Sequence, residues 1–357
     1  MIRRAVVGLS LAASACGGEV DVAPHPSRAV VAELPVVPTA GGPVLARARI
    51  ALVSFAEEPA TRLEGLFAAM RGSAWLRALG EYGVVDVELV AVRVVAREAP
   101  WGVSTDEVAA LVDESRVALG LGDELVFVVY PRKTTVHLGG RTGCRALSDF
   151  HGAIAGAPYV VLPTCAASGL LDENDDLDVR ASRAIANALT NPDPLDRPAY
   201  DLDSTTSAWI ALGRGVGDLC PYQAYEEGGR WFARVWSNAA ASTDREPCVP
   251  APTPAPLFGV TVSPDGVRAP ALGAPTTWTL RAFDLGDGAP LELSVIPGAG
   301  TLNSRASLDV ARVSAGEQAL LSTTIAPGAP PDTFVSFVVA ARRDGVARYR
   351  PVALYLP

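Results

Sequence analysis

Short apolar runs alternate with helix-like segments over the first half of the chain. The apolar runs are rich in β-branched residues and predict strands at 49–55, 84–97, 124–130 and 158–163. Helical segments begin at Thr61 and at Ser104, and each of these residues is followed three positions later by a glutamate, which is the pattern of a capping box. This order of strands and helices predicts an α/β domain over residues 48–249 with a mixed, largely parallel sheet.

A further helix is predicted from Val179 to the residues just before Pro192, because proline lacks an N–H and forces the preceding residue out of the α region. One side of this helix is apolar and is expected to pack on the sheet: Ala181, Ile185, Ala188 and Leu189. The other side carries polar side chains: Arg180, Arg183 and Asn187.

The last hundred residues show strand-like alternation and no helical period. The candidate strands are separated by turn residues such as Asp-Gly and Pro-Gly and span 258–263, 276–284, 291–296, 307–313, 319–325, 333–342 and 346–356. This number and spacing predict an all-β sandwich of immunoglobulin or fibronectin type over residues 258–357. Alternating prolines make residues 250–257 a stiff linker before it.

Composition narrows the class of protein. The chain has 357 residues, of which 49% are hydrophobic and 19% charged, so it is globular and long enough for about two domains. The net charge of −9 and the absence of a basic cluster argue against nucleic acid as a partner.

The N-terminus has the pattern of an export signal. Arg3 and Arg4 precede a short apolar run, and small residues stand directly before Cys16. This arrangement resembles a bacterial lipoprotein signal, in which residues 1–15 are removed and Cys16 is lipidated. Residues 16–47 are rich in proline and glycine and are expected to form a flexible tether. The sequence therefore predicts an exported, lipid-anchored protein of the bacterial cell envelope.

Four cysteines remain once Cys16 is set aside: Cys144, Cys165, Cys220 and Cys248. An even number in an oxidising compartment indicates disulfides, and three pairings are possible. We favour Cys144 with Cys165 and Cys220 with Cys248, since each pair joins segments that flank the central region. A zinc site of four cysteines is disfavoured because no Cys-x-x-Cys pair is present.

Several short motifs occur together in the central region. The run from Ser182 to Pro192 reads Ser-Arg-Ala-Ile-Ala-Asn-Ala-Leu-Thr-Asn-Pro, and it is followed by Gly-Asp-Leu-Cys at 217–220 and Trp-Ser-Asn at 236–238. Upstream stand Phe-His-Gly at 150–152 and Tyr-Val-Val-Leu-Pro-Thr-Cys at 159–165. Over roughly residues 48–250, this order resembles secreted bacterial metallopeptidase-like proteins, whose helix reads Ser-His-Glu-x-x-Glu-Ala-x-Thr-Asp-Pro.

The resemblance implies a zinc site on that helix, yet the ligand positions differ. In the family pattern a His and the second Glu reach a metal and the first Glu acts on bound water. Here those positions are Arg183, Ala184 and Asn187. A guanidinium has no lone pair and repels a cation, and alanine cannot act as a base. The helix is then the remnant of a lost metal site, or an ordinary packing helix that never held one.

Two metal-binding alternatives stay open. An active metal-dependent hydrolase would use His151 together with a carboxylate such as Asp172 or Asp218. A calcium loop is suggested by acidic and amide residues at alternate positions: Asp172, Asn174, Asp176 and Asp178. Leu177 at the position that needs glycine, and Arg183 at that of the closing glutamate, argue against calcium. We favour instead an acidic helix start with Asp178 as N-cap.

The sequence as a whole favours a binding protein over an enzyme. The expected architecture is a metallopeptidase-like α/β domain without its metal ligands, followed by a β-sandwich that spaces or binds. The ligand would be a protein or cell-wall material. An active hydrolase and a purely structural surface protein are the two alternatives.

Overall fold

The computed structural model describes residues 34–55, 57–138, 141–144, 148–166, 171–202, 207–251, 257–286, 288–298, 301 and 304–357. The expected signal peptide, Cys16 and most of the predicted proline linker lie outside these residues.

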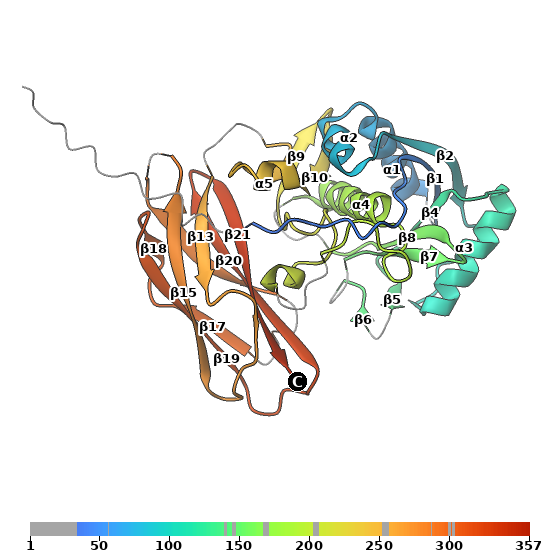
Figure 1. Cartoon of the computed structure of the whole chain (residues 1–357). Helices are drawn as coiled ribbons and strands as arrows, with labels where there is room; N and C mark the ends of the chain where they lie inside the picture. The colour runs from blue at the N-terminus through green and yellow to red at the C-terminus, as the bar shows by residue number, and fades with distance from the viewer. Residues whose placement is uncertain are drawn as a thin grey trace, which may run out of the picture. The chain divides into compact units, whose positions relative to one another are not determined.

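A five-stranded sheet forms the centre of the N-terminal part, with the order β2-β1-β4-β8-β7 (Figure 1). Its strands are β1 (Arg47–Ser54), β2 (Asp86–Val94), β4 (Leu125–Tyr130), β7 (Phe150–Ile154) and β8 (Ala157–Pro163). The first four in the order are parallel, and β7 runs antiparallel to β8. The predicted mixed α/β class with a largely parallel sheet is thus confirmed.

Helices cover both faces of this sheet. Side chains alternate along each strand, so Phe127 and Val129 of β4 face one core while Val126 and Val128 face the other. The first core is closed by α1 (Glu57–Met70), α2 (Ala74–Leu79) and α4 (Glu173–Thr190), and the second by α3 (Thr105–Leu119). This coverage explains why all six residues of β4 are buried.

The helix α4 is longer than the sequence predicted. It begins at Glu173, and its N-cap is Asp172, whose Oδ1 accepts a hydrogen bond of 2.8 Å from the Asp175 N–H. The expectation that Asp178 is the N-cap is therefore wrong. Asp178 lies inside the helix with a fully buried side chain, which accepts hydrogen bonds from Arg62. The predicted end before Pro192 is correct, because Asn191 is the C-cap.

The polar side of α4 is also buried. The apolar side packs into the first core as expected, but Arg180 and Asn187 are only 8% and 2% exposed. The Ser148 and Pro163 carbonyls accept hydrogen bonds from Arg180, and the turn 215–218 is bonded to Asn187. This part of the chain also contains short elements: the hairpin of β9 (Ala224–Glu227) and β10 (Arg230–Ala233), the pair of β11 (Val235–Trp236) and β12 (Cys248–Val249), the 3-10 helices η2 (Gly80–Tyr82) and η3 (Ala208–Ala211), and α5 (Asn238–Ala241). A small sheet of β3 (Gly102–Val103), β5 (Thr135–Leu138) and β6 (Arg141–Thr142) completes this part.

Residues 34–46, which the sequence placed in the flexible tether, instead pack on this part of the chain. The Leu45 N–H donates to the Leu189 carbonyl at 2.9 Å, and Trp236 Nε1 donates to the Pro35 carbonyl at 3.1 Å. Val37 is 1% exposed and belongs to the first core. The prediction of a flexible tether is therefore wrong for residues 34–46, and its remaining part before residue 34 lies outside the described residues.

The C-terminal strands form a β-sandwich of two sheets, with orders β13-β15-β19-β17 and β14-β21-β20-β16-β18. The strands are β13 (Phe258–Ser263), β14 (Val267–Arg268), β15 (Pro275–Asp284), β16 (Leu291–Pro297), β17 (Ser304–Leu308), β18 (Arg312–Val313), β19 (Gln318–Ile325), β20 (Thr333–Arg343) and β21 (Val346–Leu356). Side chains from both sheets share one core around Trp278. The predicted strand 307–313 is divided, because β17 and β18 belong to different sheets.

Two disulfides join Cys144 to Cys165 and Cys220 to Cys248. The favoured pairing is confirmed, and the disulfides indicate an extracellular or exported protein. Among the described residues, no helix is both long and apolar enough to cross a membrane.

Candidate functional site

Arg183 occupies the centre of a polar cluster at the position where the metallopeptidase resemblance implies a metal. The helix α4 directs its guanidinium toward the loop that precedes β7, where Nη2 donates to Ser148 Oγ and to Asp149 Oδ1. Ser148 Oγ also donates to Asp149 Oδ1 at 2.6 Å. The Asp149 side chain is 7% exposed, so this ion pair lies largely out of water.

Asn187 lies one helical turn after Arg183 and fixes a second loop. Its Oδ1 accepts a hydrogen bond of 2.8 Å from the Gly217 N–H, and its Nδ2 donates to Asp218 Oδ1 at 2.9 Å. Asp218 Oδ2 in turn accepts from the Gly215 N–H at 3.2 Å. Both ends of the amide are therefore used to hold the turn 215–218 against the helix.

Glycine is required in this turn by close approach. A Cβ placed on Gly217 would lie 2.8 Å from the Arg183 carbonyl oxygen, and one on Gly215 would overlap Asn187 Oδ1. The Gly-Asp-Leu-Cys motif thus brings Asp218 beside α4 because its backbone can touch the helix. The neighbouring Cys220 is tied to Cys248, which anchors the end of the turn.

The charges of the cluster are coupled. Burial by itself would raise the pKa of Asp149, but the Arg183 charge and the hydrogen bonds to Ser148 and Arg183 hold it below its usual value. Burial raises the pKa of Asp218 to about 6, the Arg183 charge opposes this, and the Asp149 charge adds to it. Burial also opposes the charge on Arg183, yet the two aspartates raise the pKa of its guanidinium. The charge on Arg183 therefore lowers the pKa of both buried carboxylates.

This arrangement does not fit the zinc site that the resemblance implies. The guanidinium at position 183 places a fixed positive charge beside the carboxylates that would face a metal. Ala184 is fully buried and Asn187 has both amide atoms bonded to the protein. Across the described ranges, no three His, Cys, Asp or Glu side chains are grouped so that they could hold a metal ion.

His151 lies near the cluster but does not join the other two candidate ligands. It stands on β7, and its ring is hydrogen-bonded to the backbone of Asn191 at the end of α4. Burial lowers the pKa of His151, although Asp149 opposes this shift, so the ring is neutral at pH 7. Asp172 caps the opposite end of α4, about 20 Å from Asn187 at 1.5 Å per residue. His151, Asp172 and Asp218 therefore cannot share one ion.

The acidic segment before Arg180 forms helix and no calcium loop. Asp172 is the N-cap, and the other three candidate residues lie within α4: Asn174, Asp176 and Asp178. Alternate residues on a helix point in different directions, so they cannot wrap a cation as a loop does. The expectation of an acidic helix start is correct, with the boundary moved to Asp172.

Sequence reasoning missed the partners of the two arginines. Arg180 Nη2 donates to the Ser148 carbonyl at 2.5 Å and to the Pro163 carbonyl at 2.6 Å, so it holds the loop before β7 on the edge of α4. Asp149 stands directly before the Phe-His-Gly motif. The signal that could have identified it is chemical: a cation at a metal-ligand position needs a carboxylate nearby.

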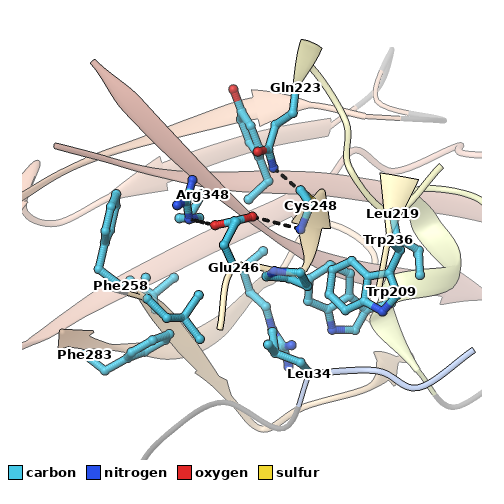
Figure 2. A pocket seen from close by; sticks show the side chains of 16 residues that line it. Leu34, Trp209, Leu219, Gln223, Trp236, Glu246, Cys248, Phe258, Phe283 and Arg348 are labelled. Atoms are coloured by element: carbon cyan, nitrogen blue, oxygen red, sulfur yellow. Dashed lines mark hydrogen bonds and ion pairs between the residues drawn. The ribbon is translucent and has the colours of Figure 1, made fainter. Parts of the chain in front are cut away.

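Figure 2 shows a cavity at the contact between the β11–β12 pair and the sandwich. The cluster residues described above do not line it. Its volume is about 40 Å³, and Trp209, Trp236 and Phe258 supply much of its apolar wall. The pair formed by Glu246 and Arg348 closes one side. This space suffices for about one water molecule and is too small for an organic ligand.

No family model matches the chain, and no curated protein sequence is similar to it. Domains 4 and 5 of the S-layer protein SbsC are 14% identical over 28% of this chain and 53% of that one, with a TM-score of 0.22. This chain thus spans about half of that fragment. A FixG-related protein from Vibrio parahaemolyticus is 11% identical over 28% of this chain and 95% of its own, with a TM-score of 0.21. Similarity at this level supports no inference about function.

Proposed function

We propose that this chain is an exported protein of the bacterial cell envelope that binds a ligand and does not catalyse a reaction. Its α/β part would be a metallopeptidase-like domain whose metal site has been replaced, and its C-terminal part an immunoglobulin-like sandwich that presents or spaces that domain. Lipidation of Cys16 would anchor it. The disulfides support the exported compartment.

The position of Arg183 is the observation that carries this proposal. Its guanidinium neutralises Asp149 by a direct ion pair and acts on the charge of Asp218. A metal ion needs lone pairs from its ligands, and arginine offers none. The cluster already has its cation as part of the chain. The arrangement supports a stable scaffold in place of an activated water.

The metal content of the purified protein tests the proposal. The full chain, exported and purified without chelators, is compared with His151→Ala and Asp218→Asn variants by elemental analysis after dialysis against zinc and against calcium. We expect no stoichiometric metal in any of the three proteins. About one equivalent of either metal in the wild type, lost in both variants, would overturn the proposal.

An active hydrolase is the second candidate, and Asp218 is the residue that favours it. A carboxyl group whose pKa is raised to about 6 is suited to proton transfer near neutral pH. Incubation of the wild type and of Asp218→Asn with casein separates the two proposals. Cleavage by the wild type alone would support the hydrolase, whereas equal background for both supports the binding role.

A further inference from the structure

A second and larger cavity adjoins the one in Figure 2. Its volume is about 260 Å³, and its walls come from residues 222–224, Arg234, Glu246, Ala251, and residues 345–349 at the turn into β21. Glu246 and Arg348 line both cavities, as do Gln223 and Tyr349. The space approaches the lower end of the range for small-molecule sites. It is therefore large enough for about one ring-sized ligand.

The cavity carries more positive than negative charge. Arg234 and Arg348 are its cations, and Glu246 is its only acidic lining residue among the residues that the structure describes. Glu246 forms its ion pair with Arg348. Arg234 is 8% exposed, and its Nη1 donates to two backbone carbonyls, the better of them that of Pro250 at 2.5 Å.

Arg234 is thus a buried cation without a carboxylate of its own within the described ranges. Burial lowers the pKa of Arg234, the Glu246 charge opposes this, and the Arg348 charge adds to it. A buried charge is costly unless an opposite charge compensates it. A bound anion would supply that compensation, and a planar carboxylate matches the geometry of the guanidinium fork.

Two tyrosines form one wall of the cavity. The rings of Tyr222 and Tyr349 lie 5.5 Å apart, tilted by 55°. Tyr222 is 54% exposed and is held at a φ of 58°, a left-handed conformation that is uncommon for a residue other than glycine. An aromatic side chain kept in the open at such a position offers a flat apolar face and a hydroxyl to a ligand.

The remaining walls are made by small residues. They are Ala224, Ala251, Gly345, Val346 and Ala347, with the amide of Gln223 beside them. Such walls leave no deep apolar hole for a large amino-acid side chain. They suit a small ring that carries hydroxyl groups, since tyrosine faces pack on its C–H face and the polar groups bond its edge.

We infer that this cavity binds an acidic sugar, a pyranose ring that bears a carboxylate, with the carboxylate at Arg234 and the ring against Tyr222 and Tyr349. The inference rests on the proposed binding function and gives that function a site and a class of ligand. Arg348 remains paired with Glu246 and adds a second donor at the same wall.

Matched pairs of ligands test the carboxylate without changing the protein. D-glucuronate, D-galacturonate and N-acetylmuramate are titrated into the full chain at low salt and followed by ligand-observed NMR, beside D-glucose, D-galactose and N-acetylglucosamine. At least one acidic sugar should bind, and its neutral counterpart should bind about tenfold more weakly or not at all. N-acetyl-L-phenylalanine is the control for a carboxylate carried by an amino acid in place of a sugar.

Variants then locate the site. Tyr222→Gly relieves the left-handed backbone, so it keeps the fold while removing the ring, and we expect at least about fivefold weaker binding. Tyr355→Ala removes an exposed tyrosine on β21 that does not line the cavity, and binding should be unchanged. Arg234→Lys keeps the positive charge but removes the guanidinium fork, so the affinity for acidic sugars should fall about tenfold.

The outcomes are distinct. Three results would overturn the inference. Acidic and neutral sugars could bind equally well, N-acetyl-L-phenylalanine could bind more tightly than any sugar, or none of the six sugars could bind. An effect of Tyr355→Ala equal to that of Tyr222→Gly would also do so. Because metal content is measured separately, failure of sugar binding in a metal-free protein would leave the proposed binding role standing, whereas bound metal with hydrolysis would remove that role itself.

Discussion

Replacing Arg183 with methionine tests whether one arginine stabilises the charge cluster of α4. The substitution keeps an unbranched side chain of similar length but removes the cation that pairs with Asp149 and acts on Asp218. Both carboxylates would then lose the cation that acts on each of them, and Arg180 would remain as a cation that acts on Asp149. Loss of one partner from a buried ion pair costs about 3–5 kcal/mol, because the other charge is left uncompensated.

The expected loss lies at the lower end of that range. The Arg183 side chain is 26% exposed, so water can partly hydrate the carboxylates once the guanidinium is gone. We therefore expect the free energy of unfolding at pH 7 to fall by about 3 kcal/mol. This corresponds to a decrease in melting temperature of roughly 6–12 °C for a cooperative unit of this size.

The pH dependence gives the prediction a second test. Without Arg183, the pKa values of Asp149 and Asp218 in the folded protein should rise above those of the unfolded chain. Protonation then favours the folded state, so the penalty should be largest at neutral pH and should shrink as the pH falls toward about 4. Chemical unfolding of the wild type and the variant at a series of pH values measures this difference.

A matched control is available on the surface. Arg197 pairs with Asp193 at 3.1 Å, but its side chain is 56% exposed. Arg197→Met should therefore cost less than about 1 kcal/mol and show little dependence on pH. If Arg183→Met were as mild as this control, or if its penalty did not change with pH, the assignment of Arg183 as the cation of the cluster would be refuted.

Three further predictions follow from single features. Burial raises the pKa of Asp218 in the folded protein to about 6. The protonated carboxyl therefore stabilises the fold fully below the usual pKa of 3.8, and this stabilisation is lost as the pH rises through 6. Asp218→Asn should reduce the loss of stability between pH 4 and pH 7, measured by chemical unfolding, by on the order of 2 kcal/mol. The Cys220–Cys248 disulfide closes a loop of 28 residues, so replacing both cysteines by serine should lower the free energy of unfolding by about 3–4 kcal/mol. A reactive thiol at either cysteine in the denatured, unreduced wild type would contradict this disulfide. Gly217→Ala should lower the melting temperature by several degrees, because its Cβ would lie 2.8 Å from a carbonyl oxygen of α4. Gly80 has open space around it, so Gly80→Ala should have no such effect. Equal melting temperatures for the two variants in thermal unfolding would disprove the close contact.

Much of the candidate site depends on contacts between distant segments. The sequence identified Arg183 and Asn187 as a polar face because both lie on one side of a helix. It did not identify Asp149, whose pairing with Arg183 spans 34 residues, or the bonds from Asn187 to the 215–218 turn. Local pattern carries no information about which loop covers a helix face.

The boundaries of α4 show the same limit. Acidic residues are favoured at a helix start, and both Asp172 and Asp178 satisfy this local rule. Tertiary contacts decide which of the two is the N-cap, because Arg62 of α1 pairs with Asp178 and allows it to be buried inside the helix. Similarly, residues 34–46 look like a tether by composition but are hydrogen-bonded to Leu189 and Trp236.

The sequence by itself determined most of the strands and the order of strand and helix, because alternation and capping act over a few residues. It favoured the cysteine pairing that the structure has, but left two other pairings open. The tertiary structure alone decided which charges meet. The cluster around Arg183 joins α4 to two loops, and the cavity at Arg234 joins residues 222–251 to the start of β21, nearly a hundred residues later. Electrostatic interactions depend on distance and burial, and neither quantity is written in the order of the residues.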